Sequence, residues 1–204
     1  MTESLPANEL TDRLNLIESM IAEGRRNTES WGWVFVLWGV AYYAAIAWSA
    51  WGSHPSLAWN ITVAAAMIVT FGIIAWRMDP ARRKSNPPTT VSRAITSTWI
   101  AVGVSMAIFI PSLGIGGRSS SNLIVAIIGI MLGTANAASS MVLKWKLQFA
   151  CAMIWWSLAV ISCVGTTRQS FIGLLVANFF CQIAFGSYMM FKEARQRRQV
   201  ASHA

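Results

Sequence analysis

Between residues 31 and 191 the chain contains six apolar stretches, each of 19 to 22 residues, that carry no Asp, Glu, Lys, Arg or His. An α-helix needs about 20 predominantly apolar residues to cross the hydrocarbon core of a bilayer. Short polar or glycine- and proline-containing segments separate the stretches, so we expect sequential spans to pack as antiparallel neighbours. The sequence therefore predicts an all-α polytopic membrane protein with six transmembrane helices. The predicted spans are residues 31–51, 56–76, 94–113, 122–143, 147–165 and 170–191.

The composition agrees with this fold class. Hydrophobic residues make up 55% of the 204 residues and charged residues only 12%, which is too apolar for an ordinary soluble domain. The net charge of +8 could indicate a nucleic-acid partner, but basic residues beside membrane spans more often orient the protein in the bilayer. We expect the lipid bilayer as the surroundings and no nucleic-acid partner.

The distribution of Lys and Arg predicts the orientation. If the N-terminus is cytoplasmic, 14 of the 16 basic residues lie on the cytoplasmic side, and only Arg118 and Arg168 lie outside. Such a bias determines topology, so both termini are expected in the cytoplasm. The chain then divides into a cytoplasmic helix at 1–29, a transmembrane domain at 30–191 and a basic tail at 192–204. The cations of the tail predict contact with anionic lipid.

Groups that could support membrane-embedded chemistry are absent from the sequence of the six spans. Carriers and intramembrane hydrolases generally need an ionisable group or a metal at membrane depth, and the spans offer no ionisable group of the carboxylate, amine or imidazole kind. The three cysteines lie far apart in apolar runs, and the two histidines are not near them. No nucleophile or phosphate-binding motif is present. We expect no catalytic residues, no cofactor, no metal site and no enzymatic activity.

Neutral polar side chains remain within the spans. An amide that faced lipid would be costly, so these groups must point into the bundle or into a wet cavity. The first interpretation is hydrogen bonding between helices, and the second is a polar lining for a small uncharged solute. Asn178 and Gln182 are spaced i, i+4, which places them on one face of an α-helix. The candidate lining residues are Tyr42, Tyr43, Asn136, Asn178 and Gln182.

The fourth span carries small residues at four-residue spacing. Gly129, Gly133 and Ala137 form the pattern GxxxGxxxA, and Ala126 lies one turn earlier. Small side chains at this spacing let two helix backbones approach closely. We expect this face to pack against a neighbouring helix of the same chain, and Gly103 and Ala107 in the third span offer a matching patch.

The segment before the first span has the pattern of an amphipathic helix. In the sequence LPANELTDRLNLIESMIAEGRR, apolar residues recur at steps of four, three and four, which is the spacing of a short coiled-coil seam. An isolated helix of this length is marginal in water, so it needs a surface to pack against. The seam, which we expect to dock a partner, consists of Leu10, Leu14, Ile17 and Ile21.

The acidic residues of this helix help to choose among three such surfaces, which are the inner leaflet, the basic loop at 82–84 and another protein chain. The carboxylates would be repelled by an anionic leaflet and attracted to the basic loop. We therefore expect docking beneath the bundle, within one chain or between subunits. The alternative is an interfacial helix that only leads into the first span. The carboxylates are those of Glu9, Asp12, Glu18 and Glu23.

The sequence LNLIESMIAEGRR, followed by WGWVFVLWG, resembles a loose group of uncharacterised bacterial inner-membrane proteins. These have a short cytoplasmic helix, rich in Ile and Met, that runs into a tryptophan-rich first span. The resemblance implies a bacterial inner-membrane location. Together with the residues above, it favours an accessory, regulatory or assembly subunit that docks a protein partner or a second copy through its N-terminal helix. The alternative function is a small channel or facilitator for an uncharged solute.

Overall fold

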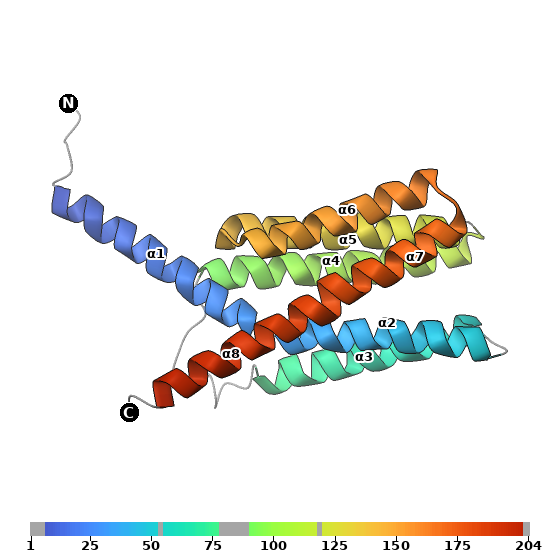
Figure 1. The fold of residues 1–204 in the computed structure, drawn as a ribbon, viewed down its shortest axis with the longest axis horizontal. Helices are drawn as coiled ribbons and strands as arrows, with labels where there is room; N and C mark the ends of the chain where they lie inside the picture. Colours follow the sequence, from blue (N-terminus) through green and yellow to red (C-terminus); the bar gives the residue numbers. More distant parts are fainter. Residues whose placement is uncertain (1–6, 53–54, 78–89, 118–119, 202–204) are drawn as a thin grey trace.

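The computed structural model describes residues 7–52, 55–77, 90–117 and 120–201, and within these ranges the chain is helical and contains no strand (Figure 1). The prediction of an all-α membrane protein is confirmed. The elements in chain order are α1 (Ala7–Glu29), α2 (Gly32–Trp51), α3 (Pro55–Arg77), α4 (Thr90–Ile115), α5 (Ser121–Leu143), α6 (Lys146–Val164), α7 (Thr167–Asn178), the π-helix η2 (Phe179–Ala184) and α8 (Phe185–Ala201).

Five helical segments among the described residues are long and apolar enough to cross a membrane, namely α2, α4, α5, α6 and the continuous helix from Thr167 to Gln196 that joins α7, η2 and α8. Helix α3 contributes a shorter apolar stretch, Leu57–Ile73. These six segments coincide with the six spans that the sequence predicts. Helix α8 runs without a break from the last span into the basic tail, so the first part of that tail is helical.

The spans run antiparallel, and α1 leaves the bundle at the end where α2 and α6 begin and α5 ends; we call this the α1 end (Figure 1). Sequential spans pack together as expected, with α2 against α3, α4 against α5, α5 against α6 and α6 against α7. The expectation is wrong for α3 and α4, which share no extended interface. The reason is the length of the connection at 78–89, which lets α4 join α5 on the other side of α2 and α8 (Figure 1).

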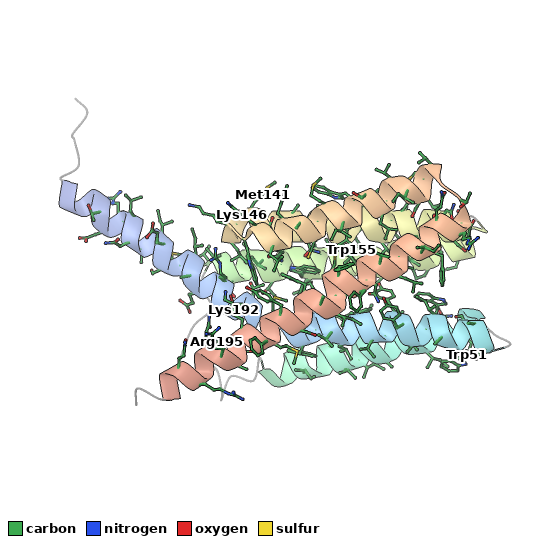
Figure 2. All side chains as sticks on the ribbon, in the orientation of Figure 1. Trp51, Met141, Lys146, Trp155, Lys192 and Arg195 are labelled. Carbon is green, nitrogen blue, oxygen red and sulfur yellow. The ribbon has the colours of Figure 1, made fainter. Side chains whose placement is uncertain are left out.

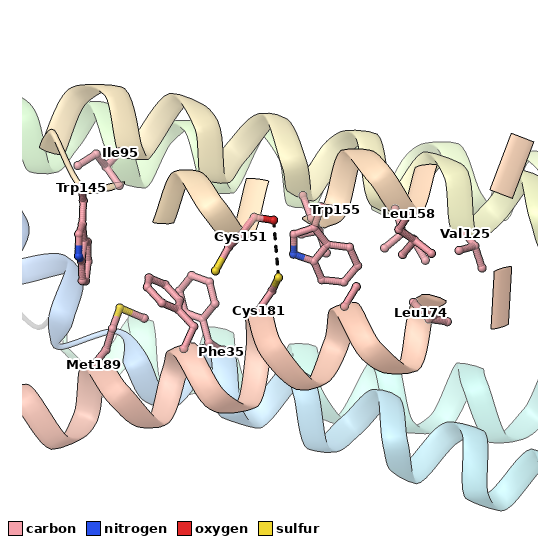
Figure 3. Close-up of a cluster of buried hydrophobic side chains, with 14 of the residues drawn as sticks. Phe35, Ile95, Val125, Trp145, Cys151, Trp155, Leu158, Leu174, Cys181 and Met189 are labelled. Atoms are coloured by element: carbon pink, nitrogen blue, oxygen red, sulfur yellow. Dashed lines mark hydrogen bonds between the residues drawn. The ribbon is translucent and has the colours of Figure 1, made fainter. Parts of the chain in front are cut away.

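The core lies where α5, α6 and the α7–η2–α8 helix meet. Trp155 of α6 is fully buried there, and the thiol of Cys181 in η2 lies 3.6 Å from the carbonyl oxygen of Cys151 in α6 (Figure 3). Toward the α1 end the core becomes aromatic. The ring of Phe35 packs edge-on against Phe185 at 5.7 Å, and Phe185 in turn packs against Trp145 at 5.3 Å. Such ring pairs stabilise a core beyond the area that they bury.

Two tight turns fix the order of the last three spans. Lys144 ends α5 in the left-handed conformation, with φ 50° and ψ 44°, and its N–H bonds back to carbonyls of α5. At the opposite end, Thr166 and Gln169 form a reciprocal capping box that starts α7. Trp51 lies near this far end, away from Lys192 and Arg195 at the α1 end (Figure 2).

Candidate functional site

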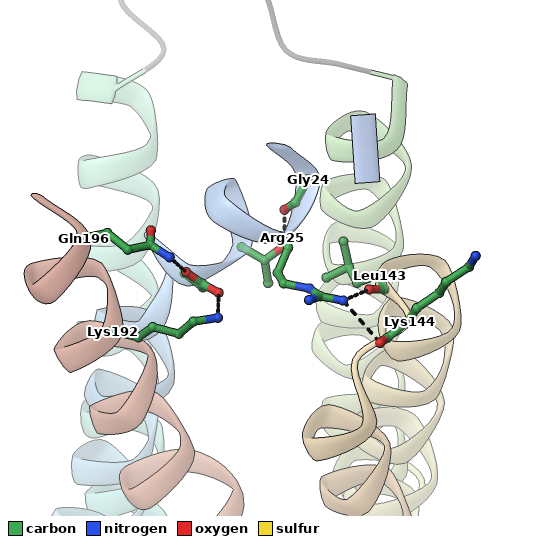
Figure 4. A network of polar contacts seen from close by, with 8 residues as sticks. Gly24, Arg25, Leu143, Lys144, Lys192 and Gln196 are labelled. Carbon is green, nitrogen blue, oxygen red and sulfur yellow. Dashed lines mark hydrogen bonds and ion pairs between the residues drawn. The ribbon is translucent and has the colours of Figure 1, made fainter. Parts of the chain in front are cut away.

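The last turns of α1 are tied to the end of α5. The guanidinium of Arg25 donates through one nitrogen to the carbonyl oxygens of Leu143 at 2.7 Å and Lys144 at 3.2 Å (Figure 4). The final carbonyls of a helix lack partners within the helix and carry partial negative charge, so a cation is favourable there. Gly24 allows α1 to approach α4 and α5 closely, because a Cβ at that position would lie 2.7 Å from a methyl group of Val91 in α4 and 3.3 Å from one of Leu143 in α5.

An ion pair with a buried carboxylate and a partly exposed ammonium ties the same region of α1 to α8. Glu29 is only 1% exposed, and its carboxylate accepts from the ammonium of Lys192 at 2.5 Å and from the amide of Gln196 at 3.3 Å (Figure 4). The same ammonium lies 5.6 Å from the centre of the Trp145 ring. A buried carboxylate is tolerated only when it is paired and hydrogen-bonded, and Glu29 is both.

The outer part of α1 extends away from the bundle (Figure 1), and the seam predicted from the sequence lies on it. Leu14 is 55% exposed and Ile17 is 53% exposed, whereas Ile21 is half-buried. Ile21 lines a hollow of about 210 Å³ with Glu18, Arg25 and other residues of the α1–α5 junction. The side chain of Leu10 and the basic loop at 82–84 lie outside the described residues. Within the described chain, Leu14 and Ile17 therefore present apolar surface that no other element covers.

The candidate lining residues do not gather around one path. Tyr42 is buried with its ring between those of Trp38 and Trp59, on the α3 side of α2. Tyr43 instead donates its hydroxyl to the carbonyl oxygen of Leu175 in α7 at 2.7 Å. These two neighbours on α2 thus serve different helix interfaces.

The amides of the lining group make structural contacts. Asn178 donates to the carbonyl oxygen of Gly39 in α2 at 3.1 Å, which is an interhelical bond. Asn136 donates to Leu132 of its own helix at 2.8 Å. Gln182 is buried and lies against Gly39, where an added Cβ would be 3.0 Å from the Gln182 Cβ. Of the candidate residues, Tyr43, Asn178 and Gln182 meet at the α2–α7–η2 interface, and Tyr42 and Asn136 lie elsewhere.

The four-residue spacing of Asn178 and Gln182 falls across the start of the π-helix, which the sequence did not indicate. A π-helix has a wider turn than an α-helix, and such segments are frequent at functional sites. Both amides are nevertheless buried. Both residues also meet Gly39 of α2, Asn178 through its amide and Gln182 through its Cβ, although not by the α-helical geometry assumed from the spacing.

Sequence reasoning overlooked Gln148, in the first turn of α6. Its side chain is fully buried, and neither its amide oxygen nor its amide nitrogen has a hydrogen-bond partner among the described residues. Other buried groups also lack a hydrogen-bond partner among the described residues, including one amide oxygen each of Asn136 and Asn178 and the hydroxyls of Ser162 and Ser170. Gln148 repeats at helical spacing with the buried Cys151, Ala152 and Trp155, and this pattern could have revealed it.

The small residues of α5 pack against α6. A Cβ on Gly129 would lie 2.7 Å from the carbonyl oxygen of Trp155, and one on Gly133 would meet the ring of Trp156. Ala126 and Ala137 are buried on the same helix. The patch at Gly103 and Ala107 is not their partner, because a Cβ on Gly103 would have no atom within 4 Å.

A second close contact, between α2 and α8, was not predicted. A Cβ on Gly32 would lie 2.7 Å from the carbonyl oxygen of Gly186, and a Cβ on Gly186 would lie 2.8 Å from that of Gly32. The two glycines are far apart in sequence and share no spacing motif. Their contact brings the first and last spans together within two helical turns of the Glu29–Lys192 pair.

Two hollows on the described residues lie at the α1 end. The larger, of about 400 Å³, follows α8 and is lined by Tyr188, Phe191, Lys192, Arg195, Gln196 and Gln199. The smaller is the hollow beside Ile21. Neither is lined by a candidate lining residue. Among the described residues no three His, Cys, Asp or Glu side chains form a group that could hold a metal ion.

Comparisons with protein-family models, with curated proteins and with solved structures give no match.

Proposed function

We propose that this chain is a non-enzymatic integral membrane protein, an accessory, regulatory or assembly subunit, that docks a protein partner through α1. The observation that carries the proposal is the apolar seam at Leu14 and Ile17, more than half exposed on a helix that extends from the bundle. Complete burial of a Leu or Ile side chain contributes about 1.5 to 3 kcal/mol. A partner that covered these two residues would gain a substantial part of that free energy.

The attachment of α1 supports the same function. Arg25 and Glu29 connect the base of the helix to α5 and α8 through polar contacts at 2.5 to 3.3 Å. A helix that is fixed before binding loses less conformational freedom when it binds. The exposed seam is thus presented on a helix whose base is already ordered.

The proposed location is the bacterial inner membrane, with the α1 end in the cytoplasm. The support is the gathering of Lys and Arg at the sequence positions that flank this end. The hollow along α8 places the exposed Phe191 next to Arg195 where the apolar span passes into the basic tail. The apolar ring of Phe191 suits the acyl chain of an anionic lipid, and the guanidinium of Arg195 beside it suits the phosphate.

A second candidate function is a facilitator for a small uncharged solute. The observation in its favour is the set of buried polar atoms that have no hydrogen-bond partner among the described residues, above all both amide atoms of Gln148. Buried groups of this kind commonly bind internal water. The proposal would require purified protein alone to accelerate the flux of glycerol or urea into vesicles.

The docking proposal is tested with two matched double variants of the full chain. Leu14→Asp with Ile17→Asp places two carboxylates in the seam, and Asn15→Asp with Ser19→Asp places two on the opposite, exposed face. Both are purified from native membranes, and their partners and particle size are measured by mass spectrometry and light scattering. We expect loss of the complex in the seam variant alone. The proposal is wrong if the seam variant retains the wild-type partners and particle size.

A further inference from the structure

The charges that flank the α1 seam indicate which partner it binds. We propose that the partner is a second copy of this chain, and that the two α1 helices pair in parallel as a short coiled coil. This inference rests on the proposed docking function and names its partner.

The heptad register follows from the seam. Steps of four, three and four place Leu14 and Ile21 at a positions, and Leu10 and Ile17 at d positions. The positions that flank the seam are then g for Arg13 and e for Glu18. Both of these side chains are exposed in the single chain, as are Leu14 and Ile17 between them.

Parallel pairing makes these two charges complementary. In a parallel two-stranded coiled coil, the residue at g lies beside the e residue five positions later in the partner, and charged pairs at these positions set partner choice and orientation. Arg13 and Glu18 are separated by five positions. The twofold symmetry of a homodimer therefore forms the Arg13–Glu18 pair twice, once on each side of the seam.

An antiparallel pair would not use these charges. In that arrangement g positions face g positions and e positions face e positions, so Arg13 does not meet Glu18 of the partner. The bilayer also favours the parallel form. Copies inserted in the same orientation carry α1 on the same side of the membrane, with both helices running from N- to C-terminus toward the bilayer. The topology of the chain and the charge pattern therefore select the same arrangement.

The seam is short, and the membrane compensates for this. Residues 10–21 span about 17 Å of helix at 1.5 Å per residue, which covers less than two heptads, and Ile21 at the base of the seam is already half-buried at the α1–α5 junction. A pair of that length would be marginal between free peptides in water. Confinement of both copies to one bilayer raises their effective concentration, and the Arg25 and Glu29 contacts hold the base of each helix in place. Both effects lower the cost of pairing.

The first test is cysteine crosslinking in native membranes, with the full chain and with the exposed Cys163 replaced by Ser. Leu14→Cys places a thiol at an a position, in the seam, and Asp12→Cys places one at an f position, on the outer face. Under mild oxidation we expect a disulfide-linked dimer from Leu14→Cys and little from Asp12→Cys. Equal crosslinking of the two variants, or none from Leu14→Cys, overturns the proposal.

The second test is a charge exchange. Arg13→Glu and Glu18→Arg each turn two attractive contacts into two repulsive ones, and we expect each to weaken association about tenfold at low salt. The double variant restores the opposite charges in exchanged positions and should recover the wild-type association. Dimer fraction is measured by single-molecule photobleaching in vesicles. A double variant no better than the single variants overturns the parallel pairing.

The outcomes also separate this inference from the docking function. If Leu14→Asp with Ile17→Asp removes a complex while Leu14→Cys gives no dimer, the seam binds a different protein, so the docking function stands and the homodimer is wrong. If neither the seam variant nor the charge variants change particle size or partners, both proposals fail.

Discussion

Gly129→Ala tests whether the small residues of α5 set its distance from α6. A methyl group at this position would lie 2.7 Å from the carbonyl oxygen of Trp155 and 3.1 Å from both the Cβ and the backbone nitrogen of Ala159. The obstacle is backbone, which cannot rotate away. Ordinary contact begins at 3.4 Å, so the two helices must separate locally by 0.7 Å, the difference from 2.7 Å.

The expected magnitude follows from comparison with Gly103→Ala, which also adds one methyl group within a helix. A Cβ on Gly103 has no atom within 4 Å, so only helix propensity changes there, in favour of Ala by about 1 kcal/mol. The same gain applies at Gly129 and cancels in the comparison. Overpacking of a well-packed interface costs about 1 to 3 kcal/mol, so the free energy of unfolding should differ between the two variants by that amount.

The assay is reversible unfolding in mixed micelles as the mole fraction of denaturing detergent increases. Tryptophan fluorescence is a suitable signal, because Trp155 and Trp156 adjoin the altered interface. Gly129→Ala should unfold at lower denaturant than Gly103→Ala, and Gly103→Ala should unfold at equal or higher denaturant than wild type. Free energies of the two variants within about 0.5 kcal/mol of each other, a spread ordinary for surface changes, would refute the packing argument.

Three further predictions concern polar contacts and topology. Lys192→Met should reduce the free energy of unfolding by on the order of 3 kcal/mol because it leaves the buried Glu29 unpaired, and adding Glu29→Gln should recover part of the loss in the same assay. Asn178→Leu with Gln182→Leu should reduce the free energy of unfolding by about 1 kcal/mol, since interhelical hydrogen bonds in membrane proteins average about 0.6 kcal/mol. If these residues line a solute path, the double variant should instead lose solute flux into vesicles while its free energy of unfolding stays unchanged. Reporter fusions should read cytoplasmic at Lys84, Trp145 and Ala204 and external at His54, Arg118 and Arg168, and a cytoplasmic signal at both Arg118 and Arg168 would contradict the six-span topology.

The helices were predictable from the sequence because their signals are local. Twenty apolar residues in a row must be helical in a bilayer, where every backbone polar group needs an internal partner. The ends were predictable for the same reason, since the polar segments between the spans coincide with the turns at Lys144 and Thr166. The π-helix was not predictable, because nothing in FFCQIA distinguishes it from its α-helical surroundings.

Contacts between segments that are distant in the sequence could not be predicted from it. Gly129 and Gly133 pack against α6 in the structure, and their spacing in the sequence could not distinguish α6 from α4 as the neighbour. Gly32 and Gly186 show no repeat at all, and only the closure of the bundle brings them together. Gln148 was overlooked because one amide at the start of a span resembles an interfacial residue until its burial is known.

The polar residues at the α1 end explain why a helix with an exposed seam belongs to this bundle and is not a separate tail. Glu29 and Lys192 each lie just outside a predicted span, and as isolated residues both fit solvated flanks. The contact between Gly32 and Gly186 brings α2 and α8 close enough for the carboxylate and the ammonium to meet, and the carboxylate then loses its water. Arg25 makes the corresponding connection to α5. Because Arg25 and Glu29 join α1 to the fourth and last spans, a partner that moved α1 would have to disturb the core of the bundle.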